Sequence, residues 1–376
     1  MKLAVLKEIE EGENRVAIIP DSIKRLSKNG FDVLIETGAG LTSGHSDQDY
    51  TDKGATIVGS AADAMAQGDC VVKVKPPTLE EADALKNGSF FISIIQSTLR
   101  HDLVKKLQEK KITAFGLDII PRTTLAQSMD VLSSMSTISG YKSVLLAADN
   151  LNKFFPMLMT AAGTVAPAKV LILGAGVAGL MACATAKRLG GVVEAFDVRP
   201  EVKEQVNSVG AKFVEVPMEE DGSGGGGYAK EMSDEYKKKQ AELISKHIAK
   251  SDVVIPTALI PGRKAPILIT EEQVKSMKPG SVIVDLAAEM GGNCAVTTVG
   301  KDTVEHGVII IGNDNLPSTM SFHASQMFSK NIEKFLFHLC DENGFTMNME
   351  DEITSGSLVT KDGEVIHELT KTLMAG

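Results

Sequence analysis

The chain's clearest chemical pattern is a glycine-rich turn between an apolar run and a helical pattern. Residues 170–173 lead directly into Gly174-Ala175-Gly176-Val177-Ala178-Gly179. In a GxGxxG turn the first glycine permits a tight turn, the second lets backbone N–H groups approach a pyrophosphate, and the third allows close helix packing. The N-terminus of the helix that follows attracts phosphate through its partial positive charge. The segment therefore predicts a dinucleotide-binding strand–turn–helix.

The residues after the next expected strand indicate which dinucleotide binds. Asp197 follows residues 192–196 and should accept hydrogen bonds from the adenosine ribose hydroxyls. Arg199 could pair with a 2′-phosphate, but a carboxylate at this position repels that group. We therefore expect NAD(H) rather than NADP(H). Small residues also end the later strand before Ala258 and Leu259, where open α/β sheets bind ligands, although an ordinary buried strand explains this pattern equally well. The expected contacts with the dinucleotide are Gly174, Ala175, Gly176, Val177, Gly179, Asp197, Val198, Arg199, Ala258 and Leu259.

Two other polar features, a loop segment and the end of a strand, are ambiguous from the residues alone. Arg122, Gln127 and Asp130 lie in a polar segment after the last strand expected in the first third of the chain. This segment is either an ordinary surface loop or a ligand contact. Asp285 ends an apolar strand, which a polar residue can do without any ligand.

The elements that must position these residues alternate between strands and helices. Strands are expected at 3–6, 31–36, 70–74, 90–95 and 112–115, and again at 169–173, 192–196, 212–216, 252–256, 281–286 and 308–312. Helical patterns separate them, including 271–276 after a Thr270 cap, and longer ones cover 130–155 and 325–339. This βαβ rhythm predicts an α/β protein with two Rossmann-like, doubly wound parallel-sheet domains separated by a cleft. We expect residues 1–136, completed by 319–376, to form one domain and 137–318 to form the NAD(H)-binding domain.

Composition excludes several classes of protein. Thirty-nine basic and 49 acidic residues give 376 residues a net charge of −10, which argues against binding nucleic acid. The four cysteines are far apart and form no CxxC pair, so neither a metal site nor a disulfide framework is expected. The first residues lack the apolar core of a signal peptide. The uncharged stretches 154–168 and 170–186 contain prolines and glycines, which favours a buried strand–turn–helix over direct membrane insertion.

Several motifs together resemble one family. They are Lys7-Glu8 with Asn14-Arg15-Val16-Ala17, the segment 126–130, Met159-Thr160-Ala161-Ala162-Gly163-Thr164, the glycine-rich turn, and Gly227-Tyr228-Ala229-Lys230-Glu231-Met232. With these motifs the chain resembles the NAD(H)-binding alpha subunits of proton-translocating NAD(P) transhydrogenases, within the superfamily that includes alanine dehydrogenase. The resemblance extends over essentially the whole chain.

The resemblance implies roles for further residues. Arg122, Gln127 and Asp130 match the family's Arg-Gln-Asp loop, which orders the nicotinamide end of NADH, and Ser133 would lie beside it. Gly227 and Tyr228 match a mobile loop that closes over the bound nucleotide.

The resemblance also implies an enzyme that works only within an assembly. Hydride would pass from NADH to NADP⁺ bound on a partner subunit, and membrane-spanning partners would couple the transfer to proton translocation. The chain would be a cytoplasmic homodimer associated peripherally with the inner membrane through those partners.

An amino-acid dehydrogenase of the alanine dehydrogenase type is the main alternative. Arg15, Lys73 and Lys75 could bind a substrate carboxylate, as their counterparts do in that enzyme. Its chemistry moves a proton as well as a hydride and needs an acid–base group, which the resemblance places as a histidine after the strand at 90–95. Gln96 stands there, and Glu289 replaces an expected aspartate. Hydride exchange between two nicotinamide rings needs only close, dry and ordered apposition. A noncatalytic NAD sensor is a third possibility.

Overall fold

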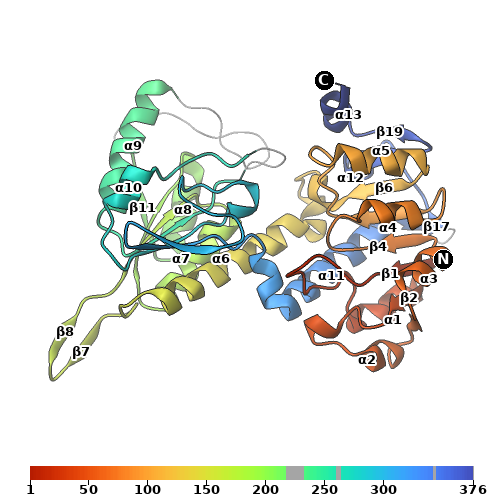
Figure 1. The fold of residues 1–376 in the computed structure, drawn as a ribbon, viewed down its shortest axis with the longest axis horizontal. Helices are drawn as coiled ribbons and strands as arrows, with labels where there is room; N and C mark the ends of the chain where they lie inside the picture. Colours follow the sequence, from red (N-terminus) through yellow and green to blue (C-terminus); the bar gives the residue numbers. More distant parts are fainter. Residues whose placement is uncertain (217–232, 260–263, 342–343, 376) are drawn as a thin grey trace. The chain divides into compact units, whose positions relative to one another are not determined.

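The computed structural model describes the whole chain except residues 217–232, 260–263, 342–343 and 376 (Figure 1). These residues form two compact units, residues 1–135 with 318–376 and residues 136–317. The first boundary lies within helix α6 (Val131–Asn150), and the second lies just before helix α11 (Ser321–Leu339).

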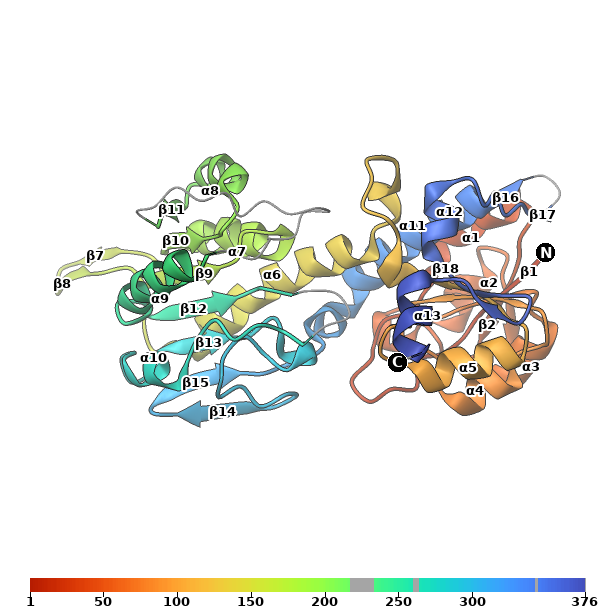
Figure 2. The same ribbon diagram turned by 90° about the horizontal axis from the view of Figure 1, so that it is seen from above.

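The first unit is built on an eight-stranded sheet in the order β19-β18-β6-β5-β4-β1-β2-β3. Figure 2 shows β1, β2 and β18 of this sheet. Six of the strands are parallel, and β18 joins β6 in antiparallel pairing. The expected strands at 3–6, 31–36, 70–74, 90–95 and 112–115 are all present with shifted ends. The strands are β1 Lys2–Val5, β2 Asp32–Glu36, β3 Thr56–Val58, β4 Cys70–Val72, β5 Phe90–Ser93, β6 Thr113–Gly116, β18 Leu358–Lys361 and β19 Glu364–Val365.

Helices cover both faces of this sheet. One face packs against α3 (Ala61–Gln67), α4 (Leu79–Ala84) and α5 (His101–Glu109) around a buried hydrophobic cluster. Side chains alternate between the faces of a strand, so Phe115 on β6 points the other way from Ala114. There Phe115 meets Phe335 of α11 edge to face, with ring centroids 5.6 Å apart.

Helix α11 also supports an extended, buried segment near the N-terminus. The backbone N–H of Val16 donates to Ser325 Oγ at 3.0 Å, and the N–H of Ile19 donates to Ser329 Oγ at 3.1 Å. Buried N–H groups outside regular structure need such partners. The C-terminal part of the chain therefore completes the first unit.

The second unit contains a seven-stranded sheet in the order β11-β10-β9-β12-β13-β15-β14. All neighbours pair in parallel except the edge strand β14, which the sequence had not suggested. The fold class is confirmed as α/β with mainly parallel, Rossmann-like sheets. The strands are β9 Lys169–Leu173, β10 Val192–Phe196, β11 Lys212–Val214, β12 Val253–Pro256, β13 Val282–Val284, β14 Asp302–Glu305 and β15 Val308–Ile311.

The helices of this unit are α7 (Val177–Arg188), α8 (Lys203–Ser208), α9 (Asp234–Ile248) and α10 (Glu271–Lys275), together with residues 136–150 of α6. The expected cap of α10 is present, with Gln273 N–H donating to Thr270 Oγ1 and Thr270 N–H donating to Gln273 Oε1.

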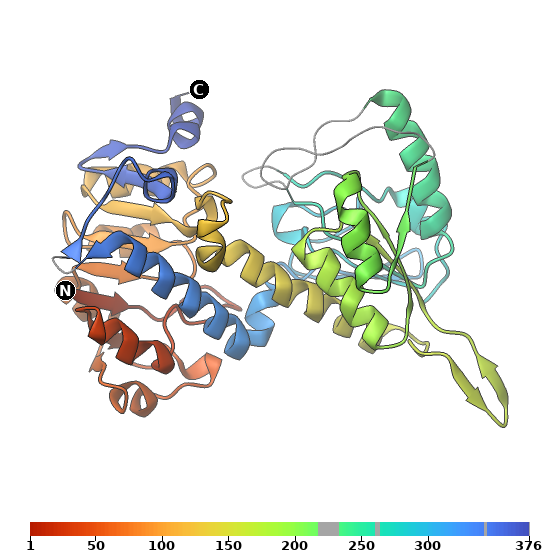
Figure 3. The same cartoon turned by 180° about the vertical axis from the view of Figure 1, so that it is seen from behind.

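The uncharged stretch before β9 differs from expectation. Residues 170–186 form the predicted buried strand, turn and helix, but residues 154–168 do not continue it. They contain a two-stranded antiparallel hairpin of β7 (Leu158–Thr160) and β8 (Gly163–Val165), which projects from its unit (Figure 3). The Met159 side chain is 77% exposed. The prediction of burial from the lack of charge and from the prolines and glycines is therefore wrong at the hairpin, because this ribbon pairs with no other strand of the described chain. Within the described residues, no helix is long and apolar enough to span a bilayer.

Candidate functional site

The glycine-rich turn lies between β9 and α7, and its three glycines face different surroundings. Gly174 has a φ of +102°, and a Cβ there would lie 2.5 Å from Thr257 Oγ1. A Cβ on Gly179 would lie 1.9 Å from the carbonyl oxygen of Gly174. A Cβ on Gly176 would meet no atom within 4 Å. Internal packing therefore requires glycine at the first and third positions, whereas the second leaves open space at the α7 N-terminus. A diphosphate fits this cradle.

Asp197, at the end of β10, holds the turn and pairs with Arg199. Its Oδ2 accepts a hydrogen bond from the Ala175 N–H at 2.7 Å, and Oδ1 accepts from the Arg199 N–H at 2.9 Å. The Arg199 guanidinium forms two further bonds to the same carboxylate, at 2.9 and 2.7 Å. These bonds to Asp197 raise the pKa of Arg199. A 2′-phosphate would have to compete with Asp197 for Arg199.

A buried amide fixes the end of β12, where Ala258 and the half-exposed Leu259 lie. The fully buried Asn293 accepts from the Ala258 N–H at 2.9 Å and donates to the Ala258 carbonyl oxygen at 2.9 Å. Asn293 N–H in turn donates to the buried Asp285 at 3.0 Å. Asp285 therefore organises the loop that contains Asn293. The role of Asn293 was not predicted from the sequence, since no local spacing links it to Ala258.

The polar segment of the first unit forms a hollow of about 240 Å³. A short 3₁₀ helix, η3 (Leu125–Met129), runs along it, and the buried Ala126 and Met129 anchor this helix. Gln127 is exposed beside the hollow, and Leu125 is 70% exposed. The lining residues are Pro121, Arg122, Thr123, Thr124, Ala126, Gln127, Asp130 and Ser133. The structure thus brings together the four residues that the resemblance assigned to nicotinamide ordering.

Asp130 caps the first turn of α6. Its Oδ1 accepts from the Ser133 N–H at 2.9 Å, and its Oδ2 accepts from the Ser133 hydroxyl at 2.6 Å. Both carboxylate oxygens are therefore oriented by the helix. Gly227 and Tyr228, expected on a loop that closes over the nucleotide, lie outside the described residues.

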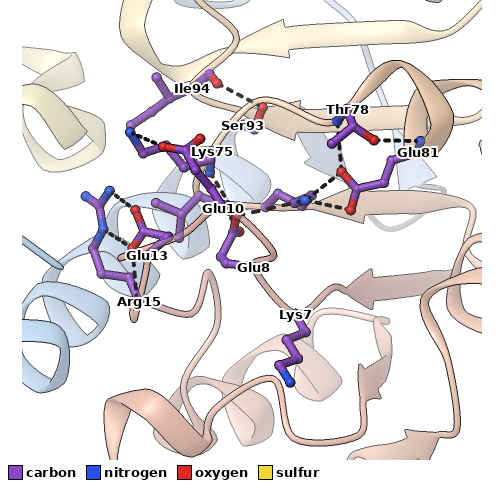
Figure 4. Close-up of polar contacts among 12 residues, drawn as sticks. Lys7, Glu8, Glu10, Glu13, Arg15, Lys75, Thr78, Glu81, Ser93 and Ile94 are labelled. Carbon is purple, nitrogen blue, oxygen red and sulfur yellow. Dashed lines mark hydrogen bonds and ion pairs between the residues drawn. The ribbon is translucent and has the colours of Figure 1, made fainter. Parts of the chain in front are cut away.

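The cations considered for a substrate carboxylate are paired with acidic side chains (Figure 4). Arg15 donates to Glu13 through two bonds of 2.8 and 2.6 Å, and both side chains are buried. Lys73 donates to both oxygens of Glu81, at 2.7 and 2.8 Å. A substrate carboxylate would therefore enter a cluster whose positive charges already have acidic partners.

Glu8 lies at the centre of the same cluster. Its Oε1 accepts from the Val74 N–H at 2.6 Å, and its Oε2 lies 3.9 Å from Lys73 Nζ. Burial raises the pKa of Glu8 to about 7, although Lys73 opposes this shift.

Gln96 follows β5 in a strained, left-handed conformation with a φ of +54°. Its N–H donates to one oxygen of Asp118 at 3.1 Å, and the Ile95 N–H donates to the other oxygen at 2.9 Å. These two hydrogen bonds to Asp118 therefore fix the backbone conformation at Gln96. A carboxamide at this place cannot act as a general acid or base. Among the described residues, no group of three or more His, Cys, Asp or Glu side chains could hold a metal ion.

Two domain models of one protein family match most of the chain. The model of the alanine dehydrogenase/PNT N-terminal domain matches residues 4–139, and that of the C-terminal domain matches residues 143–368. The chain belongs to the alanine dehydrogenase/PNT family. The resemblance inferred from the sequence motifs is thereby confirmed.

The sequence of this chain is more similar to those of two transhydrogenase relatives than to that of an alanine dehydrogenase. An NAD(P) transhydrogenase subunit alpha polypeptide of Rhodospirillum rubrum is 49% identical over 98% of this chain and 98% of its own length. A transhydrogenase structure from Sinorhizobium meliloti matches with a TM-score of 0.85 and 42% identity, covering 98% of this chain and 99% of that one. An L-alanine dehydrogenase structure has a TM-score of 0.84 but 28% identity, covering 100% and 99%.

Proposed function

We propose that this chain is the NAD(H)-binding subunit of an NAD(P) transhydrogenase. In this reaction a hydride leaves NADH and joins NADP⁺ bound on a partner subunit, which yields NAD⁺ and NADPH. The observation that carries the proposal is Gln96, a residue without acid–base chemistry, in a chain that otherwise has a dinucleotide cradle. Direct hydride exchange needs no proton at the reacting carbons, so such a chain loses nothing by having a carboxamide there.

The candidate residues divide into a binding set, which would bind the coenzyme, and an ordering set of Arg122, Gln127 and Asp130, which would order its nicotinamide ring. Residues 136–317 form one compact unit, which would bind NAD(H): the α7 N-terminus would hold the pyrophosphate and Asp197 would accept from ribose hydroxyls. Bound NADH supplies the hydride. Arg122, Gln127 and Asp130 would order its nicotinamide ring, and Ser133 keeps the Asp130 carboxylate oriented. An ordered and dry arrangement is the main source of rate for this chemistry.

Alanine dehydrogenase activity remains the competing function, supported by the L-alanine dehydrogenase structure at a TM-score of 0.84. That reaction consumes NADH, pyruvate and ammonia and requires a proton donor. Gln96 cannot provide one, and the acidic partners of Arg15 and Lys73 oppose binding of a second anion. The structure therefore favours transhydrogenation over amino-acid oxidation.

One experiment separates the two functions. The purified chain is mixed with NADH and an NADP⁺ analogue of distinct absorbance, with and without the NADP(H)-binding subunit. Reduction of the analogue only when that subunit is present supports the proposal. NADH oxidation by pyruvate and ammonia, catalysed by this chain alone, contradicts it. NADH binding without either turnover would indicate a sensor.

We also propose that two copies associate through the β7–β8 hairpin. The hairpin and its flank expose Phe154, Met157 and Met159, and the flank borders a hollow of about 560 Å³ that includes Phe155 and Pro156. An isolated ribbon with apolar side chains is only marginally stable in water, so a second copy would cover it. Met159→Glu should convert the dimer to a monomer in light scattering, whereas Leu41→Glu, also at an exposed apolar site, should not. Dimers of both variants would refute this arrangement.

The remaining assembly follows from the same proposal. Membrane-spanning subunits would carry the proton and hold this chain peripherally at the cytoplasmic face of the inner membrane. NADP(H) would belong to a partner subunit.

A further inference from the structure

Asn331 of α11 uses only one end of its amide, in a hydrogen bond to the η3 helix. Its side chain is 6% exposed, and its Nδ2 donates to the carbonyl oxygen of Ser128 at 2.9 Å. Its Oδ1 is buried, and no hydrogen-bond partner for it exists among the described residues. Because the partner atom is a carbonyl oxygen, the amide must present its NH₂ group there. The unpaired oxygen is therefore a consequence of making this bond.

A carboxamide at this position is unfavourable for folding alone. Three buried neighbours of Asn331 on α11, Phe328, Ile332 and Phe335, are apolar, and the buried polar neighbours Ser329 and Glu333 make hydrogen bonds to other residues. A buried polar atom without a partner destabilises a fold, and leucine has nearly the same shape without that atom. Selection for stability alone would favour leucine over Asn331.

The bond to Ser128 acts on the backbone between two residues of the ordering set. Ser128 follows Gln127 directly and precedes Asp130 by two residues. A single 3₁₀ turn is weakly held by its own hydrogen bonds, and the Asp130 N–H reaches the Gln127 carbonyl oxygen at only 3.4 Å. Together with the buried Ala126 and Met129, the bond from Asn331 therefore fixes the turn against α11.

We propose that Asn331 is a positioning residue for hydride transfer, which holds the η3 turn so that Gln127 and Asp130 keep their orientation. This inference rests on the transhydrogenase function proposed above. Asn331 is not among the residues that line the hollow, and it acts through the Ser128 carbonyl. A displacement of about 1 Å in a positioning group can slow a reaction on the order of 100-fold.

The test is Asn331→Leu, with Ser325→Ala as the matched control on the same helix. Asn331→Leu should melt at the same or a higher temperature than the wild type and bind NADH within about threefold of it. Its hydride-transfer kcat should fall about 10- to 100-fold. Ser325→Ala leaves the buried Val16 N–H unpaired, so its melting temperature should fall while kcat stays unchanged. If Asn331 had a purely structural role, Asn331→Leu should behave like the control, with a lower melting temperature and an unchanged kcat.

Hydrogen exchange distinguishes failure of this inference from failure of the proposed function. The backbone amides of residues 126–130 should exchange faster in Asn331→Leu than in the wild type, in the chain alone and without any partner. If wild-type protein transfers no hydride with its partners, the proposed function fails, and this exchange still tests whether Asn331 holds the turn. Unchanged exchange, or unchanged kcat in an active enzyme, overturns the inference.

Discussion

Gly176→Ala separates coenzyme binding from folding more cleanly than other changes in the nucleotide site. Gly176 has φ −74° and ψ −166°, a conformation open to alanine, and its added Cβ would meet no protein atom within 4 Å. The substitution should therefore leave the fold intact and raise its stability by about 0.4–1 kcal/mol, because alanine restricts the unfolded chain.

The same methyl group should weaken NADH binding strongly. It would occupy the space in which the pyrophosphate approaches the α7 N-terminus. Loss of one hydrogen bond to a charged group costs about 1.5–3 kcal/mol, which corresponds to an affinity about 10- to 150-fold lower.

The assay is a titration of NADH fluorescence with each protein, alongside thermal unfolding without coenzyme. Gly59→Ala is the matched control, because it lies in the other unit and its Cβ would meet only Asp63 Oδ2 at 4.0 Å. Its NADH affinity should equal that of the wild type. Unchanged affinity in Gly176→Ala would refute the placement of the pyrophosphate, and a lowered melting temperature would refute the steric reasoning.

Three further changes test other parts of the structure. Gln127→Asn should lower kcat for hydride transfer far more than NADH affinity, because a shorter side chain disturbs ring order; comparable losses would contradict this role. Asp197→Ala should weaken NADH binding and reduce the preference for NADH over NADPH, because Arg199 loses its partner Asp197 and can bind a 2′-phosphate. Competition binding of the two coenzymes measures this preference. Glu8→Gln tests the buried cluster. Burial raises the pKa of Glu8 in the folded protein from 4.5 to about 7. As pH rises between those values, the free energy of unfolding of the wild type should therefore fall by about 3 kcal/mol relative to that of the variant. Urea unfolding at pH 4.5 and 8 measures this difference, and parallel pH profiles would contradict it.

The parts of the fold that were predicted well are those whose structure is determined by residues close together in the sequence. The β9–turn–α7 unit was found because strand period, three glycines and helix pattern occur in one continuous run, and the Thr270 cap needs only four residues. The Arg-Gln-Asp segment was ambiguous until a family pattern was recognised, since a polar loop and a ligand-binding loop have similar composition.

What local pattern could not supply is pairing between distant segments. Strand β18 joins β6 across more than half the chain, the Asn293 amide meets Ala258, and Asn331 meets Ser128. The hairpin at 158–165 was misjudged for the same reason, since burial depends on which surfaces come together. Periodicity and glycine conformation are properties of a short stretch of backbone and can be inferred from residue order. Burial, ion pairing and the raised pKa of Glu8 arise only once remote segments exclude water from one another.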